Sequence, residues 1–469
     1  MPGTWFGLET ARRGMKLNQY ALEITGHNLA NASTTGYSRQ EAVINPTDPF
    51  TNPSIDSSVT PGQFGTGVEV SSIRRVKDEY LDNNVRRSTT DSAYWDDQIS
   101  VLQRAEASFA EPASDGIGER ITSFFKAWMD LNNTPQDPGV KAAVAQAGDS
   151  LATLMTYTYN QLGDVQNSVA VIDSTPAVTG GMLKDQVDEA NNLLVQIRDL
   201  TDSIKKVYAV GQQPNDLLDK RDQLLEELSK FGPLDVAFET VNGKPTGELT
   251  KLTLFGKDLS QTGTKLDLVT DGTKISLKVN GGTDNGAEVN LTDNCLDTNQ
   301  GGSLLGLERA RQDVIDYKEK LNDIAINMKS MIAGIGIDFF EGDLSTGDFK
   351  VNPGIIQNPA SINGTLAGSV ADLRDSQIDP ADKPYTFEQY YSLLVTQVGG
   401  NAKGASDMAD NQTAIKTQIT ALRDSVSGVS TDEELTKMIQ FQYGFQASAR
   451  VINVLDEMLD LLINGLVGR

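Results

Sequence analysis

Few side chains in this sequence are of types that catalyse reactions or bind metals. They are one histidine, one cysteine and several paired carboxylates. His27 is the only histidine, so paired-histidine metal sites are excluded and a Ser-His-Asp triad could use no other imidazole. It lies in the stretch HNLANASTTGYSRQ (27–40), with no Gly-x-Ser-x-Gly nucleophile motif nearby. We therefore interpret His27 as a bystander or a packing residue.

The remaining reactive types give no catalytic pattern either. Cys295 is the only cysteine, so no intramolecular disulfide can form. The Gly-Gly pairs lack the Lys-Ser/Thr that grips phosphate in a Walker loop. Acidic pairs such as Asp96-Asp97 are typical of solvated faces in so acidic a chain. The sequence predicts no enzyme, no cofactor and no metal site.

The composition limits the classes of partner that the protein can bind. The 469 residues include 64 acidic and 40 basic side chains, a formal net charge of −24, which disfavours nucleic acid and anionic membranes. No stretch approaches the roughly 20 apolar residues of a membrane span, and the first residues lack the pattern of a cleavable signal. A hydrophobic content of 38% is enough for sizeable cores, so we expect several domains.

The elements that must position these residues begin with a long helix over 5–32. Large apolar residues recur in it every seven positions, at Leu8, Met15, Leu22 and Leu29. A row of small residues runs beside them, formed by Gly7, Ala11, Gly14 and Ala21. This pattern predicts a close-packing helical seam.

Helical spacing dominates the middle of the chain, with one interruption. The predicted helices cover much of 76–231, including 139–172, 181–210 and 214–231, and then 304–332 and 386–426. Residues 41–75 are rich in proline and glycine and should be irregular or extended. Between 233 and 300 the period changes to two, and Asp271-Gly272 is placed as a two-residue hairpin turn.

The last helix carries the strongest start signal. Thr431 and Glu434 fit a capping box, with Asp432 and Glu433 in the first turn. Seam positions then step by threes and fours through Leu435, Met438, Gln442, Phe445, Ala449, Ile452, Leu455, Leu459 and Leu462. This helix too predicts a coiled-coil seam.

Two long amphipathic helices at opposite ends of the chain favour pairing. Basic residues on the first, including Arg12 and Arg13, complement Asp456, Glu457 and Asp460 on the last. The alternative is a helical hairpin that closes an ordinary domain. One partner helix cannot bury all the large apolar side chains of the first helix, so we hypothesise that both termini are poorly ordered in the monomer and become ordered on assembly.

The fold class expected is mainly α with a small β insert, in an elongated multidomain protein. Residues 1–40 and 428–469 form a paired coiled-coil assembly domain. Residues 41–232 and 300–427 form a helical-bundle core domain, with loops and a hairpin near 333–385. Residues 233–299 form a small β-rich outer domain.

At this point the two ends of the sequence become recognisable. FGLETARRGMKLNQYALEITGHNLANASTTGYSRQ resembles the N-terminal signature of the flagellar axial proteins, which comprise rod, hook and hook-associated proteins. That pattern is filled by Asn28, Leu29, Ala30, Asn31, Thr34, Gly36 and Tyr37, with Thr35 where the family commonly has proline. SGVSTDEEL, FQASARVI and LDEMLD are similar to the closing helix of the same family.

The helical block 76–231, NDLLDKRDQLLEELS and SLLGLERARQDVIDYKEKLNDIA resemble the hook-associated members. The resemblance implies a non-enzymatic, extracellular structural protein of the bacterial flagellum at the hook-filament junction, exported by the flagellar type III system. It implies self-association into a ring through the terminal helices. The implied partners are the hook protein, the adjacent hook-associated protein 3, flagellin through that protein, and an export chaperone.

The candidate site is therefore an assembly interface without catalytic, cofactor or metal residues. It comprises Leu8, Met15, Leu22, Leu29, Asn28, Asn31, Gly36, Tyr37, Leu435, Met438, Phe445, Ala449, Ile452 and Leu459. Three alternatives stay open: another axial component such as a hook protein, a cell-wall hydrolase fused to axial termini, and an adhesin that exposes the β insert.

Overall fold

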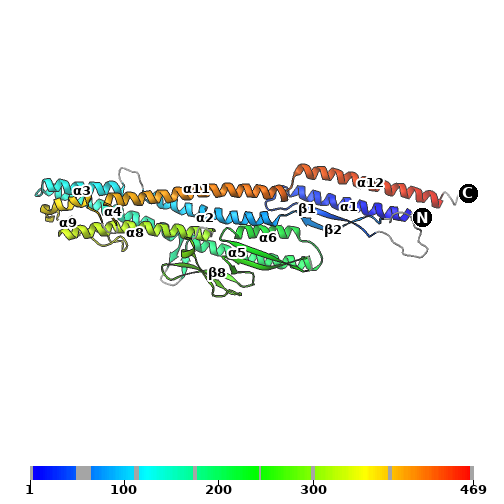
Figure 1. Ribbon diagram of the computed structural model, residues 1–469, viewed down its shortest axis with the longest axis horizontal. Coiled ribbons are helices and arrows are strands. Elements are labelled where there is room, and N and C mark those ends of the chain that lie inside the picture. Colours follow the sequence, from blue (N-terminus) through cyan, green and yellow to red (C-terminus); the bar gives the residue numbers. More distant parts are fainter. Residues whose placement is uncertain are drawn as a thin grey trace.

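The computed structural model is an elongated, mainly helical protein with long helices along its length (Figure 1). It describes residues 4–48, 65–109, 116–172, 177–241, 244–296, 301–378 and 383–464. The predicted fold class, mainly α with a small β insert and long terminal helices, is confirmed. Within these ranges no helix is both long and apolar enough to cross a membrane.

Long helices build the body of the molecule. They are α2 (Glu79–Phe109), α3 (Ile117–Asn133), α4 (Pro138–Val169), α5 (Met182–Ala209), α6 (Asn215–Leu228), α8 (Ser303–Ile335) and α11 (Phe387–Ser427). Apolar residues at three- and four-residue spacing hold them together, and in α8 these side chains are fully buried: Val314, Tyr317, Leu321, Ile324 and Met328. Glycine allows the closest contact, since a Cβ on Gly306 would lie 2.2 Å from the backbone oxygen of Tyr94 in α2.

The terminal helices lie side by side at one end of the molecule (Figure 1). They are α1 (Thr4–Ala30) and α12 (Thr431–Asn464). Strands β1 (Gln40–Pro46) and β2 (Val68–Arg75) form an antiparallel ribbon that packs on α1. The ribbon lies in the segment expected to be irregular or extended, of which residues 49–64 are outside the described part.

The β insert contains two three-stranded antiparallel sheets. The first has the order β5 (Leu234–Val241), β6 (Lys244–Leu254), β7 (Lys257–Asp258). The second has the order β10 (Glu288–Asn290), β9 (Ile275–Asn280), β8 (Lys265–Thr270), and the short helix α7 (Leu291–Asn294) follows it. Both sheets share the core with α5 and α8.

The hairpin between β8 and β9 exists, but its predicted two-residue turn is wrong. Thr270 pairs with Ile275, which leaves the four residues 271–274 in the loop. The Asp271 carboxylate accepts hydrogen bonds from the backbone N–H groups of Thr273 and Lys274, at 2.9 and 2.7 Å. This side-chain turn closes the longer loop, which the Asp-Gly pair alone did not reveal.

Two further short hairpins lie between the long helices. The helix predicted over 139–172 ends at Val169, and β3 (Val171–Ile172) pairs with β4 (Val178–Gly180) before α5. The expected hairpin near 333–385 is β11 (Phe340–Glu341) with β12 (Lys350–Val351). Short elements then follow it, namely α9 (Pro353–Gln357), η1 (Pro359–Ser361), η2 (Gly364–Leu366), α10 (Ala367–Ala371) and η3 (Asp372–Asp375).

Candidate assembly interface

A row of small residues on α1, rather than its heptad of large residues, lies closest to α12. A Cβ on Gly7 would lie 3.4 Å from Leu455, and one on Gly14 would lie 3.3 Å from Ser448 Oγ. In the opposite direction, a Cβ on Gly444 would lie 2.5 Å from Asn18 Oδ1. These contacts show that the helices are antiparallel and that missing side chains let their backbones approach.

The row on α1 follows a strict alternation of fours and threes, at Gly7, Ala11, Gly14, Asn18, Ala21, Thr25 and Asn28. Four of these side chains are buried: Ala11, Ala21, Thr25 and Asn28. The predicted large residues Leu8, Met15, Leu22 and Leu29 are only half-buried beside this row. The pair of helices therefore leaves part of their apolar surface uncovered.

On α12 the structure separates the predicted seam residues. Met438, Phe445, Ala449, Ile452 and Leu459 are half-buried. Leu435, whose side chain is 44% exposed, and the exposed Gln442 lie off the face that packs on α1, so the place of Leu435 at an assembly interface stays a prediction. Leu455, which the pattern includes, and Phe441 and Ser448, which it missed, are half-buried and continue the α1 side of the helix.

A second apolar row follows α12 on the side away from α1. Its residues are spaced by threes and fours, apart from one longer step past Ala447, and are exposed: Leu435, Ile439, Tyr443, Val451, Val454, Met458 and Leu461. At about 100° per residue, most of this row lies roughly opposite the half-buried positions, and Val451 and Met458 lie to one side of them. A helix that is apolar on two faces and covered on one has a surface available for another chain.

The two helices are tied together where α1 ends, at a polar joint that we define as residues 27–40 with their contacts. The Asn28 side chain uses both its donors, to Gln40 O and Glu434 Oε2, each at 2.9 Å. Its oxygen accepts from Gln40 N at 2.9 Å and from the Tyr37 hydroxyl at 2.8 Å. Asn28 and Glu434 are each only 1% exposed, so this buried amide has a complete set of hydrogen bonds.

The predicted residues Asn31, Gly36 and Tyr37 shape the turn that leaves α1. The Asn31 amide donates to His27 O at 3.0 Å, and Gly36 adopts a φ of 77°, which favours glycine. Tyr37 lies against His27, with 3.0 Å between its hydroxyl oxygen and Nδ1. Burial, together with the charges of nearby carboxylates, raises the pKa of the Tyr37 hydroxyl. His27 is thus a packing residue of the joint.

The predicted capping box at the start of α12 is wrong by one residue. The Ser430 carbonyl accepts from Glu434 N at 3.0 Å, and Ser430 Oγ accepts from Glu433 N at 3.5 Å. Ser430 therefore precedes the helix, and the Glu434 side chain accepts hydrogen bonds from Asn28 and Lys437. A local motif missed this role because Asn28 lies 406 residues away.

Helix α6 holds the other side of the joint through carboxylates that sequence reasoning missed. Asp219 accepts from the backbone N–H of Ser38 at 3.0 Å and from Arg75 at 2.9 Å. Asp222 pairs with Arg75 and Lys77. Burial alone would raise the pKa of Asp222, but those two cations lower it. The spacing of the acidic residues at 216, 219, 222 and 226 along one helix was the sequence signal that could have revealed this role.

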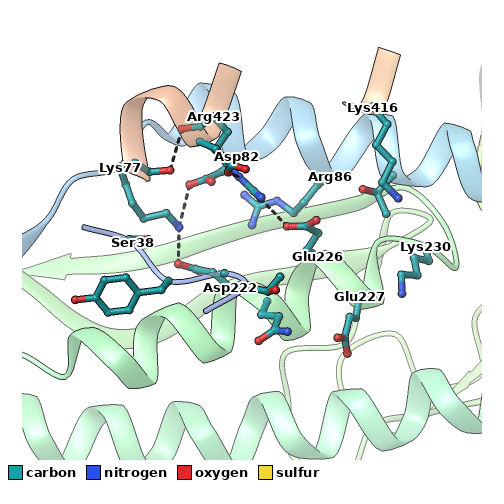
Figure 2. A pocket seen from close by; sticks show the side chains of 17 residues that line it. Ser38, Lys77, Asp82, Arg86, Asp222, Glu226, Glu227, Lys230, Lys416 and Arg423 are labelled. Atoms are coloured by element: carbon teal, nitrogen blue, oxygen red, sulfur yellow. Dashed lines mark hydrogen bonds and ion pairs between the residues drawn. The ribbon is translucent and has the colours of Figure 1, made fainter. Parts of the chain in front are cut away.

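A cleft of about 310 Å³ opens between the joint, α2, α6 and α11 (Figure 2). Several of its charged groups form ion pairs within the protein: Lys77 lies between Asp82 and Asp222, and Arg423 donates to Glu226 at 2.7 Å. Arg39 closes the joint beyond it, since its backbone N–H donates to Ser427 O at 2.8 Å and its guanidinium pairs with Glu433 at 3.1 Å. These ion pairs link α2, α6 and α11 beside the joint.

The ion pairs of the first helix differ from the predicted charge complementarity between the terminal helices. Arg12 and Arg13 both form ion pairs with Glu9 on their own helix. These contacts lower the pKa of Glu9 to about 2. Small-residue packing and the joint, rather than these arginines, therefore account for the α1 and α12 pairing.

The described residues contain no group of three or more His, Cys, Asp or Glu that could hold a metal ion. Cys295 is buried, and burial raises its pKa to about 12, which removes thiolate character near neutral pH.

Models of flagellar protein families match this sequence at both ends and in the middle. Residues 102–334 match the family described as the flagellar hook-associated protein FlgK helical domain. Residues 8–37 match the flagella basal body rod protein family, and residues 423–465 match the flagellar basal body rod FlgEFG protein C-terminal family.

Two named relatives span nearly the whole chain. Flagellar hook-associated protein 1 of Bacillus subtilis (strain 168) is 28% identical over 99% of this chain and 99% of its own. That of Salmonella typhimurium is 21% identical over 97% of this chain and 98% of its own. Among solved structures, the flagellar hook junction protein FlgK from Burkholderia pseudomallei has 22% identity and a TM-score of 0.43, over 54% of this chain and 43% of that one.

Terminal helices that carry the rod-protein matches, with a helical body between them, define a flagellar axial protein. Within that class, the chain belongs to the flagellar hook-associated protein 1 family. It is a structural component of the bacterial flagellum rather than an enzyme, and it works in contact with other axial components.

Proposed function

We propose that the chain forms the hook-filament junction by polymerising through α1 and α12. The observation that carries this proposal is the exposed apolar row on α12, opposite the face that packs on α1. A neighbouring copy covers the row in the assembled ring, and the half-buried Leu8, Met15, Leu22 and Leu29 supply further apolar surface on α1. The domain of terminal helices (1–40 and 428–469) thus assembles, while the helical core (41–232 and 300–427) and the β insert (233–299) face outward.

The partners follow from this position. The ring contacts the hook protein on one side and hook-associated protein 3 on the other, and through the latter it reaches flagellin. The exposed row of α12 also needs a cover before assembly, which is the role of an export chaperone. Export runs through the flagellar type III system.

A charge placed on the exposed row tests the proposal. Ile439 is 54% exposed, so Ile439→Asp should leave the monomer folded while it blocks incorporation at the hook tip. Gln442→Asp is the matched control, because Gln442 is exposed on the same helix but is already polar, so the change removes no apolar side chain. Electron microscopy of hooks mixed with each purified variant reads out incorporation. Equal incorporation of both variants would reject the row as an interface.

A further inference from the structure

Helix α6 lies between two parts of the molecule that are distant in sequence. On one side, its residues hold the joint and the ribbon: Asn215 donates to Gln40 Oε1 and Ile73 O, at 3.1 and 3.0 Å, and Asp219 and Asp222 hold Ser38 and Arg75. On the other side, α6 contacts the β insert that follows it. One short helix therefore makes specific contacts with both.

Arg221 makes the contact with the insert. Its guanidinium donates from Nη1 to Gly247 O in β6 at 2.8 Å and lies 4.3 Å from the ring centroid of Phe238 in β5. The side chain is only 3% exposed, and burial lowers its pKa to about 10. Gly247 packs closely on α5, since a Cβ there would lie 2.6 Å from Ile204 Cγ2.

We infer that α6 couples the β insert to the joint of the assembly helices, with Arg221 as the positioning residue. Arg221 fixes α6 against the carbonyl of Gly247, and the neighbouring Asp219 and Asp222 carry that position to Ser38 and Arg75. The inference rests on the proposed function because the joint matters only if the helices it carries assemble.

The coupling gives the insert a mechanical role. A force on the sheet of β5, β6 and β7 reaches α6 through a buried charge-assisted hydrogen bond, which is stronger than an exposed one, and through a cation-π contact. From α6 it reaches the joint through buried carboxylates. The insert is then part of the support of the terminal helices and not a passive decoration.

Arg221→Met removes the guanidinium while it keeps an unbranched side chain, and amide hydrogen exchange in the full-length monomer reads out the joint. The reporters are the N–H groups of Ser38 and Gln40, which donate to Asp219 and Asn28. We expect their exchange to rise about tenfold. Arg198→Met is the matched control, because Arg198 donates to Leu259 O in the insert at 2.8 Å from α5, which holds none of these joint residues. It should leave both amides within about twofold.

A milder variant guards against simple unfolding. Phe238 is 37% exposed, so Phe238→Leu removes the ring beneath the guanidinium with little cost to the fold and should raise joint exchange in the same direction by a smaller factor. The coupling is overturned if Arg221→Met and Arg198→Met change the joint alike, or if Phe238→Leu loosens the sheet without moving the joint. Because the readout is taken on monomer, it stands or falls independently of ring formation.

Discussion

Asn28 and Glu434 join the two ends of the chain through a 2.9 Å hydrogen bond between Asn28 Nδ2 and Glu434 Oε2. Both side chains are buried although 406 positions separate them in the sequence. The bond closes the α1 and α12 pair at the end where the joint begins. It therefore connects the geometry of the assembly helices to that of the body.

Removing the acceptor should weaken this closure. Glu434→Ala leaves the Asn28 and Lys437 donors without their partner, so we expect a loss of about 1–3 kcal/mol in the local stability of the α1 and α12 pair. Glu433→Ala removes only the exposed carboxylate that pairs with Arg39, so it should cost under about 1 kcal/mol. Hydrogen exchange of α1 amides measures both, and equal losses would contradict the assigned role of Glu434.

Phe445→Asp should separate the terminal helices. Phe445 is half-buried on the α1 side of α12, so a charge there is poorly solvated and opens the pair, whereas Ile439→Asp does not. We expect faster proteolysis of both termini, an unchanged melting transition of the helical core, and no incorporation. Gln446→Asp, on an exposed position next to it, is the control for opening of the pair and is read by proteolysis. Normal incorporation of Phe445→Asp would show that this seam is wrongly assigned.

The terminal helices should be less protected than the core in the free monomer. Among the described side chains of α12 only Glu434 is buried, whereas α8 buries sixteen residues. Few buried contacts make local opening cheap. Hydrogen exchange should therefore be faster in α1 and α12 than in α8, and faster than in the same helices after assembly. Protection of both termini equal to that of α8 would refute ordering on assembly.

Acidic pH should stabilise the core through Asp313. Burial raises the pKa of this carboxyl to about 6 against the opposing charge of Arg309. The folded protein thus binds the proton more tightly than the unfolded chain, and the stability from this group, up to about 3 kcal/mol, is present below pH 4 and lost as the pH rises through 6. Asp313→Asn should flatten that part of the profile in denaturant unfolding between pH 4 and 7. Asp407→Asn, at an exposed pair with Lys403, should leave it unchanged.

Two glycines in helix interiors should respond oppositely to alanine. In Gly306→Ala the new Cβ meets the backbone of Tyr94, which cannot move away, so we expect a loss of about 1–3 kcal/mol. Gly400 in α11 has no atom within 4 Å of a new Cβ, so Gly400→Ala should stabilise by about 0.5–1 kcal/mol. Denaturant midpoints of the two variants check both signs.

Sequence patterns were sufficient where local periodicity decides the structure. The buried row of α8 and the small residues of α1 follow from spacing, because a helix repeats every 3.6 residues. The patterns failed where a distant partner decides. Glu434 resembles a capping residue until Asn28 is placed beside it, and Leu435 fits the spacing of the seam although it lies off the face that packs on α1. The acidic face of α6 resembled solvated charge because its partners, such as Ser38 and Arg75, lie far away in the chain.

The only thiol of the chain is buried and therefore unreactive. Cys295 is 1% exposed and its pKa is raised to about 12, so at pH 7 almost none of it is thiolate. A cysteine introduced at an exposed site such as Gln442 would thus take a maleimide dye selectively, with the native residue left in place. Pairs of such dyes on α12 and the β insert would report, molecule by molecule, how the two move during assembly.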